Sequence, residues 1–282
     1  MMERRAASQE ASRTTEINSG RLLWITLDRI FYAGPLATSS VRTMGCWNLY
    51  AAPLGEIAVR IADGPWQTSQ LAVVQPYQPH QVRSESQAIY SLKLEAESIN
   101  PECLPTELRM LNAVHAPALL AHLHACCDKL CGSGGELDLR SLDFDRLFFG
   151  RTVPPRTLDR RIESVLARIK ANPASNLSAE ECAESVHLSF SRFLHLFKQE
   201  VGVPFRGFRT WKRARSLLHY INRKASLASV ALDTGYPDST HFSHSIRHVY
   251  GARPKEMFAA SRRLPVYGHL ISPAAPAGLF HG

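Results

Sequence analysis

ALDTGYPDSTHFSHSIRHVYGARPKEM, residues 231–257, predicts a short helix, a turn and a second helix with two unlike faces. Phe242, Ile246 and Val249 recur at helical spacing, so their side chains should point inward together. The opposite face carries residues that donate or accept hydrogen bonds: Thr240, Ser243, His244 and Arg247. Gly235 would permit a left-handed turn where the two helices approach each other. The stretch therefore predicts a helix-turn-helix motif, whose second helix, the recognition helix, presents its polar face to the major groove of DNA.

A second copy of the pattern lies upstream in AESVHLSFSRFLHLFKQEVGVP, residues 183–204. Five positions correspond at offsets of 48 to 50 residues: Ala183 and Ala231, Phe193 and Phe242, Phe197 and Ile246, Gly202 and Gly251, Pro204 and Pro254. This recognition helix should bury one apolar face, made of Phe190, Phe193, Phe197 and Val201. It should expose a polar face, made of Ser191, Arg192, His195 and Lys198. His187 stands where the other copy has its turn glycine, so this turn is the weaker match.

Residues 204–224, PFRGFRTWKRARSLLHYINRK, join the two copies and carry seven Lys or Arg and no acidic residue. They predict a connecting helix whose apolar side chains, such as Phe208 and Trp211, pack against both motifs. A helix of this length spans roughly 30 Å. Successive major grooves on one face of a duplex recur at about 34 Å. One molecule should therefore place both recognition helices in adjacent grooves.

From residue 158 to residue 263 the chain resembles the DNA-binding domain of the AraC/XylS family of bacterial transcription regulators. The most specific matches run from Phe197 through Gly202 to Pro204, and from Gly235 to Pro254. The resemblance implies an all-α domain with two helix-turn-helix motifs joined by a long helix. It also implies the base-reading positions Ser191, His195, Ser239, Thr240 and His244. Long Arg and Gln side chains are absent from these positions, so methyl, phosphate and shape contacts should matter more than bidentate Arg–guanine contacts.

The net charge of +8 conceals an asymmetry between the two halves of the chain. Residues 1–150 hold 13 Lys or Arg and 16 Asp or Glu, a net charge of −3, whereas residues 151–282 hold 20 and 9, a net charge of +11. The basic charge lies in the half with the duplicated motif, as a phosphate-binding surface requires. The predicted phosphate contacts are Arg192, Lys198, Arg206, Arg209, Lys212, Arg213 and Arg247.

Residues 20–131 predict a mainly β domain that ends in a helix. Between residues 21 and 97, short apolar or alternating segments of strand length are separated by Gly, Pro, Asn and Asp. Several strands before any helix favour an antiparallel barrel or sandwich. The region resembles the cupin-like effector or dimerisation domain found ahead of the helical domain in this family. Residues 106–131 predict a helix, kinked or broken at Pro117, that either contacts a second copy of the chain or covers the barrel.

Two places are candidates for metal binding. His80 is the only histidine before residue 115, and one histidine cannot build a cupin metal site, so a structural role is favoured. Later, His122 and Cys126 are four residues apart, as are Cys127 and Cys131, and either pair could hold an ion or sense thiol oxidation. Free cysteines are more often buried as small hydrophobic residues. We therefore predict no metal and no cofactor.

The remaining segments define the domain boundaries. A linker is predicted at residues 132–156, and the DNA-binding domain at residues 157–264. Residues 1–19 predict a disordered arm and residues 265–282 a flexible tail. The N-terminus lacks the apolar core of a signal peptide, and no run approaches the roughly 18 apolar residues of a membrane span. These features predict a cytoplasmic protein that does not contact membranes.

The sequence carries no catalytic pattern such as a Gly-rich phosphate loop, a nucleophile elbow or an HExxH motif. We therefore predict that the protein is not an enzyme but a sequence-specific transcription regulator that binds double-stranded DNA and activates or represses promoters. RNA polymerase, a small-molecule effector and a second copy of the chain are the further partners considered. The alternatives are a nucleoid-type or RNA-binding protein and a metal- or thiol-sensing regulator that uses residues 122–131.

Overall fold

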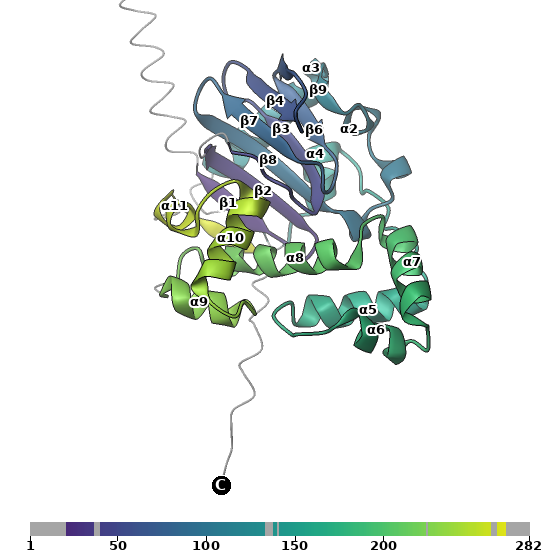
Figure 1. Ribbon diagram of the computed structural model, residues 1–282. Helices are drawn as coiled ribbons and strands as arrows, with labels where there is room; N and C mark the ends of the chain where they lie inside the picture. Colours follow the sequence, from purple (N-terminus) through teal and green to yellow (C-terminus); the bar gives the residue numbers. More distant parts are fainter. Residues whose placement is uncertain are drawn as a thin grey trace, which may run out of the picture.

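The computed structural model describes residues 21–36, 40–132, 138–139, 141–223, 225–260 and 264–268. Within them, a β-rich N-terminal domain packs over a helical C-terminal domain, as Figure 1 shows. This arrangement confirms the predicted two-domain fold class. The predicted disordered arm, residues 1–19, and residues 269–282 of the predicted tail lie outside the described residues.

The N-terminal domain is built from two sheets. Seven strands pair in the order β10-β1-β2-β8-β3-β6-β9, and three pair in the order β5-β4-β7. The strands are β1 Leu22–Ile25, β2 Arg29–Pro35, β3 Cys46–Ala51, β4 Ile57–Ile61, β5 Trp66–Ser69, β6 Leu71–Val74, β7 His80–Ser84, β8 Ala88–Glu95, β9 Asn112–Val114 and β10 Val266–Gly268. The smaller sheet covers part of the larger one, because Val59 and Val82 share a buried cluster with Tyr50 and Ile89. Two facing layers, antiparallel except where β10 joins β1, fit the predicted cupin-like barrel.

One face of the seven-stranded sheet is covered by helices that follow the strands. Helix α3, Pro117–Gly132, and helix α4, Phe144–Phe149, pack on Leu92 and Leu94 of β8. The shorter helices nearby are η1 Ala96–Ser98, η2 Pro101–Cys103 and α2 Thr106–Arg109. Because side chains alternate along a strand, Lys93 and Glu95 point to the opposite face of the sheet. That face meets the C-terminal domain.

The C-terminal domain contains two helix-turn-helix units joined by one helix. Its helices are α5 Arg160–Ala171, α6 Ala179–Ser185, α7 Phe190–Val201, α8 Phe205–Ser216, η3 Leu217–Tyr220, α9 Leu227–Asp233, α10 Ser239–Tyr250 and α11 Pro254–Ala260. The first unit has a core of its own helices, in which Phe193 and Phe197 pack with Ile162 of α5, and the barrel adds only Ala96 and the partly buried Tyr77. The second unit has no separate core, because Phe242 and Ile246 belong to a cluster that continues into the barrel.

This shared core joins the two domains. Trp211 of α8 is 1% exposed and lies in one cluster with Leu23, Ile25 and Met44 of the barrel. A Cβ on Gly45 would overlap the Trp211 side chain, so the barrel backbone approaches α8 as closely as it can. All four residues of β1 are buried, because both faces of the sheet are covered. The barrel therefore forms part of the core of the second helix-turn-helix unit.

The structure differs from the predicted boundaries in two places. The predicted linker, residues 132–156, contains α4, whose Phe144 and Phe148 are buried against the sheet. Within the predicted tail, Val266–Gly268 form β10, which pairs in parallel with β1. The amide of Leu23 donates to the carbonyl of Pro265 over 2.9 Å. Small residues and proline suggested mobility there, but a free strand edge can recruit even a short segment.

Two predicted helices are shorter than expected. The connecting helix was predicted over residues 204–224, whereas α8 ends at Ser216 and continues as one 3₁₀ turn to Tyr220. The helix predicted over residues 106–131, with a kink or break at Pro117, is broken: α2 covers Thr106–Arg109, and α3 begins at Pro117, where the missing amide costs no hydrogen bond. The preceding Asn112–Val114 pair with β6 as strand β9. Among the described residues, no helix is both long and apolar enough to cross a membrane.

A shared core predicts cooperative unfolding of the two domains. We expect Trp211→Ala to lower the free energy of unfolding by about 3–5 kcal/mol, because it opens a cavity between them. Circular dichroism and tryptophan fluorescence should report one transition that shifts as a whole. Trp66→Ala, on the outer sheet where Arg60 and Arg83 stack on the ring, should cost about 1 kcal/mol. Two separate transitions, only one of them shifted by Trp211→Ala, would contradict the shared core.

Candidate nucleic-acid interface

The first helix-turn-helix unit is defined by capping at each helix end. The Ser178 hydroxyl accepts from the Glu181 amide, and the Glu181 carboxylate accepts from the Ser178 amide, which starts α6. Ser189 caps the recognition helix α7. Gly202 ends α7 at a φ of 80°, a conformation that favours glycine. These local signals fix both ends of α7.

The second unit repeats the arrangement with a stronger cap. Asp238 accepts from the amides of Thr240 and His241, at 2.7 and 2.8 Å, and starts the recognition helix α10. Gly251 ends the helix at a φ of 69°. The Tyr236 ring packs edge-on against Phe242, which holds the turn against α10. Figure 1 shows α7 and α10 near the two ends of α8.

The two turns differ as the sequence predicts. His187 adopts a φ of 55° in the first turn, a conformation that is uncommon for a residue with a Cβ. Gly235 adopts a φ of 81° in the second. A Cβ on Gly235 would also overlap the backbone of Ala174, in the loop that follows α5. The glycine thus allows the second unit to contact the first.

The five predicted base-reading residues are all exposed on the recognition helices. Ser191 and His195 lie on α7, and Ser239, Thr240 and His244 on α10. Phe190 was predicted to be buried, but 46% of it is exposed. The apolar face of α7 is filled by Phe193, Leu196, Phe197 and Val201, and Phe190 begins the helix outside that face. Each recognition helix therefore presents short polar side chains, and α7 adds one exposed aromatic ring.

The predicted phosphate contacts separate into two groups. Arg192, Lys198, Arg206 and Arg247 are exposed and free to meet a phosphate. Arg209 and Lys212 are buried, at 7% and 4% exposure, so the prediction is wrong for both in this conformation. Both residues lie in a basic helix, which suggested a DNA-facing surface. In the structure, one side of α8 is buried against the rest of the protein along its whole length. Arg213 is partly buried and bonded within the domain.

Arg209 and Arg213 join α8 to the loop after α5. Both guanidinium groups donate to the carbonyl of Ser175, and Arg213 also donates to the Asn176 side chain over 2.9 Å. Burial, followed by the neighbouring Arg213, lowers the pKa of Arg209 to about 10. Together with the contact between Gly235 and Ala174, these bonds fix the two units relative to each other.

A cavity of about 140 Å³ lies between the barrel and the second unit. Most of its lining is apolar and includes Leu23, Ile30, Met44, Leu218 and Ile221. Arg42 and Lys93 also line it, and both are buried, at 5% and 8% exposure. Among the described residues, neither forms an ion pair with a carboxylate, and Nε and Nη2 of Arg42 have no hydrogen-bond partner. Buried cations without a counter-ion are unfavourable.

The electrostatics of this cavity follow from its two cations. Burial, together with the nearby Arg42, lowers the pKa of Lys93 to about 8. Burial also lowers the pKa of His80 to about 3, with Arg42 and Lys93 adding to the effect. His80 bonds to the Tyr50 hydroxyl at 2.8 Å and to the Gln78 carbonyl at 2.7 Å, in keeping with a structural role. Glu256 lines the cavity, but its carboxylate accepts from the Arg253 amide.

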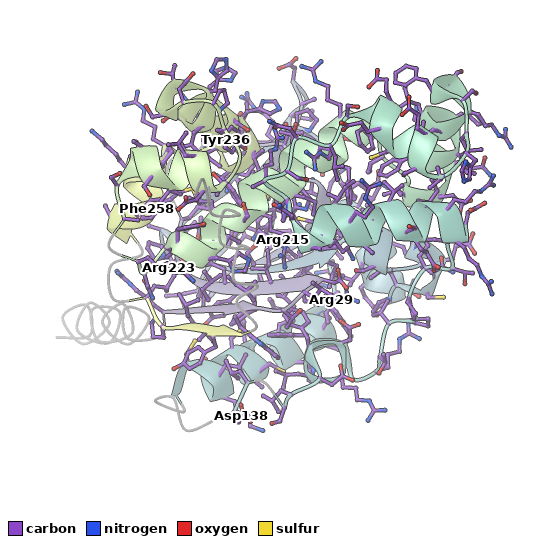
Figure 2. All side chains as sticks on the ribbon, turned by 90° about the horizontal axis from the view of Figure 1, so that it is seen from below. Arg29, Asp138, Arg215, Arg223, Tyr236 and Phe258 are labelled. Atoms are coloured by element: carbon purple, nitrogen blue, oxygen red, sulfur yellow. The ribbon has the colours of Figure 1, made fainter. Side chains whose placement is uncertain are left out.

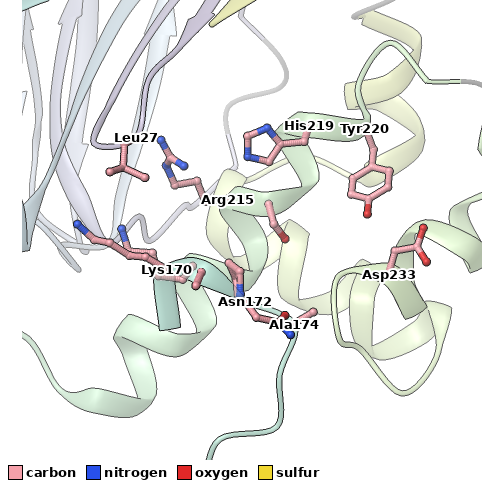
Figure 3. A pocket seen from close by; sticks show the side chains of 12 residues that line it. Leu27, Lys170, Asn172, Ala174, Arg215, His219, Tyr220 and Asp233 are labelled. Carbon is pink, nitrogen blue, oxygen red and sulfur yellow. The ribbon is translucent and has the colours of Figure 1, made fainter. Parts of the chain in front are cut away.

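A smaller cavity of about 40 Å³ lies where the barrel meets both units, and Figure 3 shows it at close range. Lys170 of α5, Arg215 of α8 and Leu27 of the barrel meet there. His219 also lines it, and burial followed by the neighbouring Arg215 lowers the pKa of that imidazole to about 4. His219 is therefore neutral near pH 7.

The His122–Cys131 segment lies on α3, away from the recognition helices. Nε2 of His122 and Sγ of Cys126 both bond to the Leu147 carbonyl of α4, at 2.9 and 3.1 Å. Burial raises the pKa of Cys126 and of Cys131, which keeps these thiols protonated. Among the described residues, no three His, Cys, Asp or Glu side chains come together in a way that could hold a metal ion.

Residues 182–260 match the protein-family model described as a helix-turn-helix domain. An uncharacterized HTH-type transcriptional regulator of Haemophilus influenzae is 26% identical over 99 residues, and the arabinose operon regulatory protein of Escherichia coli is 31% identical over 108 residues. These alignments cover 35% and 38% of this chain, and the chain spans only 33% and 36% of the two relatives.

The fold is similar to that of ToxT from Vibrio cholerae, at 10% identity. A crystal structure of an apo ToxT variant gives a TM-score of 0.56 over 83% of this chain and 97% of that chain. A ToxT structure with an unsaturated fatty acid bound gives 0.51 over 83% and 95%. At this identity the likeness shows the two-domain fold.

The close approach of the two units gives a testable prediction. Gly235→Ala should destabilise the chain by about 1–3 kcal/mol beyond the cost of its positive φ, because the new methyl group meets backbone atoms. Gly150→Ala is the matched control, since Gly150 also has a positive φ, 68°, but a Cβ there would meet no atom within 4 Å beyond its chain neighbours. It should cost about 1 kcal/mol. Equal losses in urea denaturation would show that the units do not touch at Gly235.

Proposed function

Because residues 182–260 form a helix-turn-helix domain of the AraC type, we propose that this protein is a sequence-specific DNA-binding transcription regulator. The observation that carries the proposal is the pair of capped recognition helices, α7 and α10, each with an exposed polar face. The net charge of +11 on residues 151–282 favours a polyanionic partner.

Base reading and phosphate contact would fall to different residues. Ser191 and His195 on α7, and Ser239, Thr240 and His244 on α10, would face base edges in the major groove. The exposed cations Arg192, Lys198, Arg206 and Arg247 would contact phosphates and hold the helices in register. Short side chains at the reading positions favour contacts with thymine methyl groups and with DNA shape over bidentate readout of guanine.

Several finer features belong to the same proposal. The protein would act in the cytoplasm, as a non-enzymatic activator or repressor, and an activator would contact RNA polymerase. The exposed side of α3 is the surface that would meet a second copy of the chain. A nucleoid-type or RNA-binding protein is the main alternative, since basic charge alone does not select duplex DNA of one sequence. A metal- or thiol-sensing role for residues 122–131 finds less support, because His122 and Cys126 are already bonded to α4.

We expect base-reading and phosphate-contacting residues to behave differently on mutation. His244→Ala should reduce discrimination between the preferred site and a mutated site by about 1–3 kcal/mol. Lys198→Ala should weaken binding to both sites equally and reduce the dependence of affinity on salt. Fluorescence anisotropy with both duplexes, at several salt concentrations, measures the two effects. The assignment fails if both variants change specificity equally, or if RNA competes as well as the preferred duplex.

The cavity at Arg42 and Lys93 supports a second function, the binding of an effector. We propose that the ligand has a carboxylate or similar anionic head and an apolar body, because two buried cations that form no ion pair among the described residues stand in a mostly apolar cavity. That ToxT has been crystallised with an unsaturated fatty acid is consistent with such a ligand. Leu218 of η3 and the following Ile221 belong to the lining, so an occupant would contact both domains.

Carboxylate binding should depend on pH through Lys93. A series of straight-chain carboxylates and the matching alcohols, titrated by calorimetry, should show binding of the acids only. Since the pKa of Lys93 is lowered to about 8, affinity should be highest below that pH and fall above it as the ammonium group loses its proton. Lys93→Met should abolish this pH dependence, whereas Lys129→Met, an exposed position on α3, should not. Alcohols that bind as well as acids would exclude an anion site.

A further inference from the structure

The barrel and the C-terminal helices meet at a buried group of charges, which we term the interdomain ion cluster. The barrel supplies three acidic residues and the helices supply three basic ones: Asp28, Glu95 and Glu97 with Lys170, Lys212 and Arg215. Figure 2 shows Arg215 between the helices and the sheet, and Figure 3 shows Lys170 and Arg215 on the side of the pocket that faces the barrel. Sequence patterns gave no sign of this cluster, because its members lie far apart along the chain.

Glu97 joins the first unit to α8 through a single oxygen atom. Its Oε1 lies 3.1 Å from Nζ of Lys170 on α5 and 2.6 Å from Nζ of Lys212 on α8. Glu97 is 3% exposed, so little water screens the two contacts. Burial opposes the charged carboxylate, but the Lys212 and Lys170 ammonium groups hold the pKa of Glu97 well below its usual range. Near neutral pH the carboxylate therefore stays charged and bridges both helices.

Glu95 fixes α8 over one helical turn. Its Oε2 accepts from Nε1 of Trp211 at 2.6 Å and from Nζ of Lys212 at 2.8 Å, and its Oε1 lies 2.6 Å from Nε of Arg215. Arg215 also donates to the carbonyl of Thr26 in the barrel. The position of α8 along its axis and its rotation about that axis are thereby set by the barrel.

The contacts continue from α8 to the second recognition helix. The Tyr250 hydroxyl at the end of α10 donates to the Ala214 carbonyl of α8 over 3.3 Å. The rings of Trp211 and Tyr250 are 6.0 Å apart. The Thr43 amide of the barrel donates to the His248 carbonyl over 3.0 Å. An unbroken set of contacts therefore runs from α5 through Glu97 and Glu95 to α8 and α10.

We propose that Glu95 and Glu97 are positioning residues that set the relative placement of the two recognition helices, and so the half-site spacing that the protein accepts. This inference rests on the proposed function. The carboxylates do not touch DNA and act through Lys170, Lys212 and Arg215. Without Glu97, Lys170 would keep only Asp28 and Lys212 only Glu95 as acidic partners. The carboxylate shared by α5 and α8 would be lost, the two ammonium groups would repel each other, and α5 would move away from α8. The first unit would then sample several orientations relative to the second.

Half-site spacing is a readout that stability alone would not change. Each inserted base pair turns one half-site by roughly 35° relative to the other. A rigid pair of helices should lose about tenfold or more in affinity when one or two base pairs are added or removed. We define the spacing profile as the affinity of the full chain for a series of duplexes. Their spacers run from two base pairs shorter to two base pairs longer than the preferred spacer.

The test uses two variants and one matched control. Glu97→Gln removes the bridging charge, and Lys170→Met removes the cation on α5, whose side chain is 21% exposed and whose loss is more easily tolerated. In both variants, affinity should vary by about threefold or less across the spacer lengths. The preference for the half-site sequence should remain. Asp145→Asn is the control, because it breaks a similarly buried pair with Arg29, 2.8 Å apart, whose other hydrogen bonds go to Asp28, Ser98 and Val153 rather than to α5 or α8. It should keep the wild-type profile.

The outcomes are distinct. A Lys170→Met profile as sharp as that of the wild type overturns the inference, even if Glu97→Gln does not fold. Flattening by Asp145→Asn to the same degree also overturns it, since general destabilisation would then explain the effect. A wild-type chain that binds one half-site sequence but ignores spacing refutes the positioning role and leaves the proposed function intact. A wild-type chain with no sequence preference refutes the proposed function itself.

Discussion

Two carboxylates that cannot reach water, Glu95 and Glu97, determine how the molecule is put together. A buried carboxylate is tolerated only when cations neutralise it, and those cations come from α5 and α8 of the other domain. The barrel therefore cannot separate from the helices without exposing charges and the apolar surface around Trp211. The two helix-turn-helix units are thus held in place by the barrel as well as by α8, the helix that joins them.

This arrangement gives the basic residues of the C-terminal half two separate roles. Lys212 and Arg215 neutralise the barrel, and Arg209 bonds to the loop that follows α5. The exposed cations on the recognition helices, such as Lys198 and Arg247, remain for a nucleic acid. The interdomain cavity borders the same contacts, because Tyr250 and Leu218 line it. A ligand at Arg42 would therefore act on groups that already position α10.

The sequence predicted the features that arise from local chemistry. Amphipathic spacing located both recognition helices, and the matched glycines of the two copies, Gly202 and Gly251, stand where these helices end. It could not predict which polar side chains meet across domains. Lys93 and Glu95 alternate with leucines on β8, as on a strand with one solvated face, but that face is covered by helices. Lys212 looked like a DNA contact for the same reason, since nothing near it in sequence shows that Glu97 is its partner.

With both recognition helices held in place, one chain should read two half-sites at a fixed separation. The most direct test of this fixed separation is to select bound duplexes from a pool that carries a long randomised segment. The full chain is used at a concentration where it is monomeric. We expect two short conserved elements in every selected duplex, with centres about one helical turn apart and little variation in the gap between them. A single conserved element, or two elements at many separations, would contradict it.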